Sequence, residues 1–149
     1  SKINVLHKSV FILGAGGVVS SIIFSLLSMG CKKIYLTNRT IEKAENIKDK
    51  FDEVEILKWG EIPNFDIVIN ATSVGLKGDS LDLVLNVKDK IFYDVIYNPK
   101  ETQFLKEAKK NGNKIENGKF MFIYQANQSF SIWNNVIPKI DDEVLKIIG

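Results

Sequence analysis

The sequence predicts an α/β domain in which a parallel sheet carries helices on both faces. Short apolar, β-branched segments alternate with segments of helical periodicity along all 149 residues, and a glycine cluster follows the first apolar segment. Such alternation is typical of right-handed β-α-β units. We therefore expect a doubly wound, mostly parallel sheet of about six strands.

The predicted strands and helices follow one another without an internal repeat or a linker. Strands are expected at residues 9–13, 33–37, 54–57, 66–70, 90–95 and 114–116. Helices are expected at residues 17–29, 41–51, 101–110, 119–134 and 141–148, with Thr40 as the N-cap of the second. We therefore treat residues 1–149 as one domain, with the helices from about residue 119 at its border.

Composition and charge argue against several kinds of partner. The 20 Lys and Arg residues nearly balance the 18 Asp and Glu residues, so neither nucleic acid nor an anionic membrane surface is expected as a partner. No apolar run is long enough to span a membrane. Cys31 is the single cysteine, which excludes an intrachain disulfide and a cysteine-rich metal site. We expect a reducing, cytoplasmic location and no metal.

The glycine cluster Gly14-Ala15-Gly16-Gly17 lies between the first predicted strand and the first predicted helix. The first glycine permits a tight turn, the second lets the backbone approach a pyrophosphate, and the helix N-terminus offers N–H groups to phosphate oxygens. This order indicates a Rossmann-like dinucleotide site. Val19 stands where a third glycine is usual, and we expect its bulk to move the helix outward.

The end of the second predicted strand favours NADP over NAD. NAD-binding domains usually place Asp or Glu there for the ribose 2′-hydroxyl, whereas this chain reads Thr37-Asn38-Arg39-Thr40. Arg39 is the only arginine in the chain, and a guanidinium binds a 2′-phosphate through a planar pair of donors. Lys43 adds a second positive charge. The alternative for Arg39 is an ordinary solvated surface cation.

A series of segments gives the chain a resemblance to one enzyme family. They are the glycine turn, Asn38-Arg39-Thr40 with Lys43, Asn70-Ala71-Thr72-Ser73-Val74-Gly75, Asp94-Val95-Ile96-Tyr97-Asn98-Pro99, and then Gly118, Gln125, Phe130 and Trp133. In this order they resemble the C-terminal, NADP-binding domain of shikimate dehydrogenase. The resemblance implies a reversible hydride transfer between NADPH and 3-dehydroshikimate, which gives shikimate in aromatic amino acid biosynthesis.

The resemblance also implies a role for each group of residues. It implies that the pyrophosphate is held by Gly14, Ala15, Gly16, Gly17 and Val18. The adenosine ribose and its 2′-phosphate are implied to contact Asn38, Arg39, Thr40 and Lys43. For the rest of the cofactor, the resemblance implies contacts with Asn70, Ala71, Thr72 and Ser73. It also implies that Ile96 packs against the nicotinamide and that the Gly118 carbonyl binds the carboxamide. Tyr97 and Gln125 are implied to bind the substrate.

Taken singly, these residues also have ordinary structural explanations. Asn70 is equally explained as a side chain that satisfies backbone groups at a strand end, Tyr97 as a packing aromatic, and Gln125 as a surface residue. The family also often has an arginine shortly after the glycines, where this chain has Ser20. The loss of that charge is expected to lower the affinity for the cofactor.

The residues that transfer the proton in this family have no counterpart in this chain. They are a Lys and an Asp of an N-terminal substrate domain, and here only a short segment precedes Gly14. We therefore expect no catalytic residue in the chain, a site for shikimate or 3-dehydroshikimate shared with that absent domain, and no turnover by the chain alone. Aromatic residues of the border helices, if exposed, offer a surface for self-association.

Two other functions stay open. One is a stand-alone nucleotide-binding or regulatory module, and the other is a paralogue in the same family that acts on quinate or another hydroxy acid. The Asn38-Arg39-Thr40 segment argues against an enzyme that prefers NAD. An upstream region rich in β-α-β units, with a Lys and an Asp, would exclude the stand-alone module.

Overall fold

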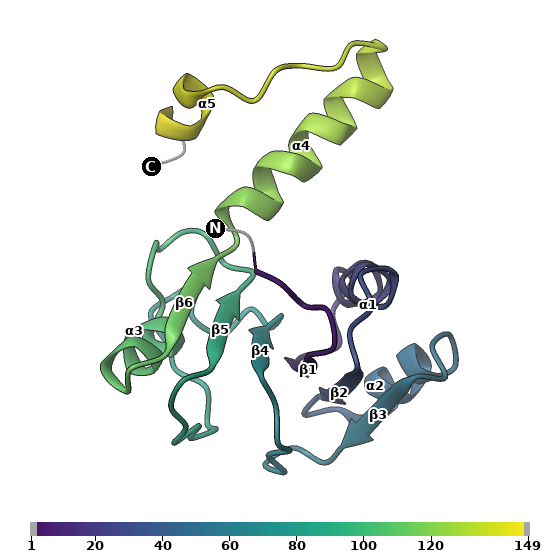
Figure 1. Cartoon of the computed structure of the whole chain (residues 1–149), viewed down its shortest axis with the longest axis vertical. Helices are drawn as coiled ribbons and strands as arrows, with labels where there is room; N and C mark the ends of the chain where they lie inside the picture. Colours follow the sequence, from purple (N-terminus) through teal and green to yellow (C-terminus); the bar gives the residue numbers. More distant parts are fainter. Residues whose placement is uncertain (1–2, 148–149) are drawn as a thin grey trace.

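The computed structural model describes residues 3–147 and shows one six-stranded parallel sheet between layers of helices (Figure 1). The strands are β1 (Ser9–Leu13), β2 (Lys33–Thr37), β3 (Val54–Leu57), β4 (Ile67–Asn70), β5 (Ile91–Asp94) and β6 (Lys114–Asn117). Their order is β3-β2-β1-β4-β5-β6, and every neighbouring pair is parallel. The predicted doubly wound sheet is confirmed.

The helices of the described chain are α1 (Val19–Ser28), α2 (Ile41–Lys48), α3 (Gln103–Lys110), α4 (Lys119–Asn134) and α5 (Asp142–Ile147). The second helix ends at Lys48 rather than at the predicted Phe51. The N–H of Phe51 donates to the Lys48 carbonyl at 3.0 Å, a bond of the tighter kind that closes helix ends. The predicted end of the last helix, Ile148, lies outside the described residues.

The alternation of side chains along each strand divides the core into two parts. Val10 and Ile12 of β1 point to the face covered by α1 and α2. Phe11 and Leu13 point to the opposite face, where Leu105 of α3 packs. Both faces of the central strand are therefore buried, as its continuous apolar sequence predicts.

Two crossovers carry no helix, which departs from the simple alternation of strands and helices. The chain runs as loop between β3 and β4 and again between β4 and β5. In the second loop Leu81, Leu83, Leu85 and Val87 pack against the α3 side of the core, and the residues between them are exposed. Apolar side chains at alternate positions thus cover part of the sheet without a helix.

The α4 helix leaves the sheet after β6 and extends away from it (Figure 1). Ile123 is its one buried residue, whereas Trp133 is 80% exposed. The chain then turns back, and the Lys119 ammonium donates to the Leu145 carbonyl of α5 at 2.6 Å. The described chain therefore leaves most of α4 uncovered. None of the helices in residues 3–147 is long and apolar enough to cross a membrane.

Candidate functional site

The last residues of neighbouring strands lie side by side at the carboxyl edge of the sheet. Leu13 of β1 is in register with Thr37 of β2 and with Asn70 of β4, and Asn70 is in register with Asp94 of β5. Doubly wound sheets bind ligands at this edge, where the strand order reverses, which is here between β1 and β4. The sequence segments assigned to a dinucleotide therefore meet in one place.

The turn after β1 requires glycine at its first position. Gly14 has a φ of +102°, and a Cβ there would lie 2.8 Å from Cγ2 of Thr72. The turn after β1 therefore packs directly against the segment after β4. A Cβ at Gly17, by contrast, would meet nothing within 4 Å, so the space in front of the following helix is open.

The N-terminus of α1 faces this open space, and its Val19 N–H donates to the Gly16 carbonyl at 3.0 Å. Within the described chain, no side chain caps α1, and its first turn holds no acidic residue. The first N–H groups of a helix carry the positive end of its dipole, which favours an anion. Val19 is fully buried in the core, so the packing of α1 accepts this side chain in place of glycine. The cradle fits a pyrophosphate.

Asn38 ties the glycine turn to the end of β2. Its Oδ1 accepts a hydrogen bond from the Ala15 N–H at 3.1 Å, and its Nδ2 donates to the Thr40 carbonyl at 2.7 Å. Thr40 stands at the predicted N-cap of α2, but its side chain makes no capping hydrogen bond. The hydroxyl of Thr37 is buried without a partner among the described residues. Unengaged hydroxyls thus remain beside the turn.

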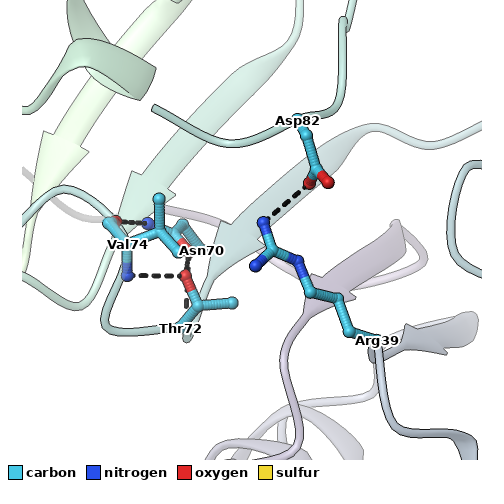
Figure 2. A network of polar contacts seen from close by, with 5 residues as sticks. All are labelled: Arg39, Asn70, Thr72, Val74 and Asp82. Atoms are coloured by element: carbon cyan, nitrogen blue, oxygen red, sulfur yellow. Dashed lines mark hydrogen bonds and ion pairs between the residues drawn. The ribbon is translucent and has the colours of Figure 1, made fainter. Parts of the chain in front are cut away.

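Arg39 is exposed at the end of β2 and contacts two residues from the helix-free crossovers. Its Nη2 lies 2.8 Å from Oδ1 of Asp82, as Figure 2 shows, and its guanidinium carbon lies 5.4 Å from the centroid of the Trp59 ring. The hydrogen bond and positive charge of Arg39 hold the pKa of Asp82 below its usual value. Lys43 is exposed on the first turn of α2 and has no ion pair within the described chain.

A buried polar network surrounds Asp94 at the end of β5. Both carboxylate oxygens lie 3.2 Å from Nδ2 of Asn70, and Oδ2 accepts from the Thr102 hydroxyl at 2.6 Å. Oδ1 accepts from the Ile96 N–H at 3.0 Å. Burial raises the pKa of the Asp94 carboxyl above its usual value, although these hydrogen bonds act in the opposite direction. The network links β4, β5 and the start of α3.

The side-chain oxygen Oδ1 of Asn70 organises the loop after β4. It accepts from the Thr72 N–H at 3.1 Å and from the Thr72 hydroxyl at 2.7 Å, and the Asn70 amide also donates to the Val74 carbonyl at 3.2 Å (Figure 2). The side chain thus has structural partners, as the ordinary explanation for Asn70 proposes. The place of Asn70, Ala71, Thr72 and Ser73 along the cofactor stays a prediction.

The segment after β5 contacts the start of α4. The Gly118 N–H donates to the Ile96 carbonyl at 3.2 Å. A Cβ at Gly118 would overlap the Val95 carbonyl, so only glycine fits this position. Tyr97 stacks on Phe122 of α4 with ring centroids 4.5 Å apart. Ile96, Tyr97 and Gly118 therefore lie at one corner of the domain.

Gln125 lines an open cavity of about 550 Å³ between α1, β4, β5 and α4. Apolar side chains such as Val18 and Ile69 form much of its wall. Gln125 follows Phe122 by three positions on α4, so the two side chains are neighbours on the helix surface. Neither Tyr97 nor Arg39 lines this cavity, so Gln125 is related to Tyr97 only through Phe122, on which Tyr97 stacks.

Sequence reasoning missed two residues at this edge of the sheet. Neither Trp59 nor Asp82 was singled out, yet both contact Arg39. One signal for Asp82 was present: it lies between Leu81 and Leu83, in an alternating apolar pattern that directs it outward. Nothing in the local sequence connects it with a residue 43 positions earlier.

Comparisons with known proteins show the family and the fold of the chain. The model of the Shikimate / quinate 5-dehydrogenase family matches residues 1–78, more than half of the chain. The chain belongs to this family. The Shikimate dehydrogenase (NADP(+)) of Pelagibacter ubique is 54% identical over 149 residues, which cover 97% of this chain and 56% of the relative.

Solved structures of the family share the fold. A shikimate dehydrogenase in complex with NADP+ is 38% identical, with a TM-score of 0.77 over 97% of this chain and 54% of that one. Shikimate 5-dehydrogenase from Listeria monocytogenes, in complex with shikimate and NAD, is 27% identical, with a TM-score of 0.84 over 97% of this chain and 57% of that one. The chain spans about half the length of the curated relatives it matches.

Proposed function

We propose that this chain is the NADP-binding part of a shikimate dehydrogenase. Such an enzyme reduces 3-dehydroshikimate to shikimate with NADPH and catalyses the reverse oxidation with NADP. The observation that carries the proposal is the position of Arg39. It is exposed at the end of a β2 strand that ends without a carboxylate of its own, and Asn38 joins this strand end to the glycine turn. A guanidinium there attracts a 2′-phosphate that a carboxylate would repel.

We place the adenosine half of NADP across the ends of β1 and β2. The open space at Gly17 and the uncapped start of α1 support a pyrophosphate held by Gly14, Ala15, Gly16, Gly17 and Val18. The exposed cations at the start of α2 support a 2′-phosphate site formed by Asn38, Arg39, Thr40 and Lys43. These groups bind through backbone donors and fixed positive charge.

We place the nicotinamide between the loop after β4 and the segment after β5. The backbone hydrogen bond from the Gly118 N–H to the Ile96 carbonyl supports this, because it joins the segment after β5 to the start of α4. The Gly118 carbonyl accepts one bond from the Phe122 N–H at 2.9 Å and retains a second lone pair for a carboxamide. The cofactor, when bound, supplies the hydride, and these residues orient it.

We propose that Tyr97 and Gln125 bind the substrate. A phenol and an amide bind hydroxyls and a carboxylate while staying neutral, which suits shikimate. Asp94 is fully buried and hydrogen-bonded to Asn70 and Thr102, so it is not placed to supply the proton that carbonyl reduction needs. We assign proton transfer to a Lys and an Asp of a further domain, which contacts the exposed face of α4.

The hydroxy acid has a second candidate within the same family. The family model covers both shikimate and quinate dehydrogenases, so quinate is the alternative substrate. The similarity to the Pelagibacter ubique shikimate dehydrogenase favours shikimate. Calorimetric titration of the NADP-saturated chain with shikimate and with quinate compares the affinities for the two acids.

Calorimetric titration of the chain with NADP and with NAD tests the cofactor assignment. We expect NADP to bind more tightly, and Arg39→Ala to weaken NADP by about ten- to a hundred-fold through the loss of a charge-assisted contact. The affinity for NAD should stay within about two-fold, because it carries no 2′-phosphate.

A matched control separates this contact from a general loss of positive charge. Lys109 is an exposed cation paired with Glu101 at 2.8 Å, as Arg39 is with Asp82, but it lies on α3. Lys109→Ala should leave both affinities unchanged. Equal affinities for NADP and NAD, or an NADP affinity unchanged by Arg39→Ala, would show that the assignment is wrong.

A further inference from the structure

Asp82 lies against the residue that our proposed function assigns to the 2′-phosphate. Its Oδ1 is 2.8 Å from Nη2 of Arg39 (Figure 2). We propose that Asp82 is a specificity-determining residue. It acts as an internal anion that pairs with Arg39 in the free protein and must be exchanged for the 2′-phosphate when NADP binds. This inference rests on the proposed function.

The chain fixes Asp82 at this position through its neighbours. Leu81 and Leu83 pack against the α3 side of the core, and Asp82 between them is exposed. The carboxylate therefore cannot withdraw far from Arg39 without moving two apolar side chains out of the core. A residue anchored in this way differs from a long surface side chain that meets a cation by chance.

The position of Arg39 is restricted on a second side by Trp59. The guanidinium carbon lies 5.4 Å from the centroid of the indole ring, within the range of a cation–π contact. Trp59 belongs to the crossover between β3 and β4, and Asp82 to the crossover between β4 and β5. The two helix-free crossovers thus hold the side chain at the strand end where the 2′-phosphate is proposed to bind.

The exchange is chemically favourable because the ion pair is exposed. The side chains of Arg39 and Asp82 are 57% and 65% exposed, and pairs in such surroundings are weak. A phosphate monoester carries more negative charge than a carboxylate and offers more acceptor oxygens. NADP therefore replaces Asp82 at the guanidinium, and the lost ion pair reduces the net affinity.

NAD needs no such exchange because its ribose carries a 2′-hydroxyl instead of a phosphate. The pair between Arg39 and Asp82 stays intact when NAD binds. Asp82 therefore lowers the affinity for NADP and does not lower the affinity for NAD. The second cation of the proposed site, Lys43, has no acidic partner within the described chain, so Asp82 acts through Arg39.

Titration of Asp82→Asn and Asp82→Ala with NADP and NAD tests this inference. Both variants should raise the ratio of the NAD to the NADP dissociation constant by about two- to five-fold, the range for an exposed ion pair. In an Arg39→Ala background, Asp82→Asn should leave the ratio unchanged. Thermal unfolding of each variant confirms that the fold is retained.

Asp89→Asn is the matched control for the change in net charge. Asp89 is exposed, and it precedes β5 at the opposite edge of the sheet, where its positive φ of 57° suits asparagine. It should not change the ratio. An equal rise in Asp89→Asn, or an NADP affinity that is unchanged or lowered in both Asp82 variants, overturns the role of Asp82.

Different results distinguish a failure of the proposed function from a failure of the inference about Asp82. If Arg39→Ala alone leaves the NADP affinity unchanged, the 2′-phosphate site is wrong, and the role of Asp82 falls with it. If Arg39→Ala weakens NADP but the Asp82 variants do not strengthen it, the site stands and only the inference about Asp82 is overturned.

Discussion

The Asn70 amide donates to both carboxylate oxygens of Asp94, at 3.2 Å from each, between the ends of β4 and β5. Both residues are fully buried. The loops that follow these strands are those we assign to the nicotinamide half of the cofactor. The contact therefore sets the relative position of two loops before any ligand binds.

Replacement of Asn70 should destabilise the domain strongly. Asn70→Ala removes a donor from a buried carboxylate and frees the loop that Thr72 anchors, so we expect a loss of about 2–4 kcal/mol in the free energy of unfolding. Urea denaturation followed by circular dichroism measures it. The control is Asn86→Ala, an exposed residue that should change stability by less than about 0.5 kcal/mol. Similar values for both variants would contradict a structural role for Asn70.

The raised pKa of Asp94 predicts a pH dependence with a definite sign. Because burial disfavours the carboxylate, the native state binds this proton at a higher pH than the unfolded chain does. The stability contributed by the protonated group is therefore present at low pH and lost as the pH rises through the folded pKa.

Comparison with Asp94→Asn isolates this contribution from that of the other carboxyls. The free energy of unfolding of the wild type, relative to Asp94→Asn, should increase as the pH falls from neutral towards about 4, the ordinary pKa of an Asp carboxyl, above which the folded pKa lies. Urea denaturation of both proteins at several pH values measures the difference. A difference that is constant or decreases would show that Asp94 is not held above its ordinary pKa.

Gly118 should tolerate no side chain. A Cβ there would overlap the Val95 carbonyl, so Gly118→Ala must displace either β5 or α4. We expect a loss of about 1–3 kcal/mol in urea denaturation, as for other overpacked sites. Gly17→Ala is the control, because a Cβ there meets nothing within 4 Å. Gly17→Ala should keep the stability of the wild type and lose NADP affinity. A large loss of stability in Gly17→Ala together with none in Gly118→Ala would contradict the assigned environments of both glycines.

The chain by itself should bind NADP without oxidising shikimate. We assign proton transfer to a further domain, because Asp94 is buried behind its hydrogen bonds to Asn70 and Thr102. The appearance of NADPH absorbance in a mixture of chain, NADP and shikimate measures turnover. The dehydrogenase of Pelagibacter ubique serves as the positive control. A rate proportional to the concentration of the chain would place the proton donor within it.

The uncovered face of α4 and the segment after it should cause the 149-residue chain to self-associate. Trp133 and Ile137 are 80% and 84% exposed, and large exposed apolar side chains favour association. Sedimentation velocity at increasing concentrations should show a rising average mass, and Trp133→Ser with Ile137→Ser should reduce it. Val84→Ser, at a residue 82% exposed on the opposite side of the sheet, is the control. A monomer at every concentration contradicts the prediction.

Much of the fold could be read from the sequence. The predicted bounds of β1, β2, β3 and α4 coincide with the observed ones. Apolar β-branched runs that end at glycine or charged residues define buried strands locally, and parallel strands require crossovers of one hand. These two rules also predict that the glycine turn and Arg39 lie at the carboxyl edge of the sheet, because each follows directly after a parallel strand.

The sequence by itself determined the strands, their parallel order and the glycine turn before the first helix, because these depend on local periodicity and on backbone conformation. Only the tertiary structure decided which side chains meet at the ends of the strands. The contact of Arg39 with Asp82 spans 43 positions, and that of Asn70 with Asp94 spans 24. Such contacts depend on strand register and on the path of two helix-free crossovers, for which local propensity carries no information.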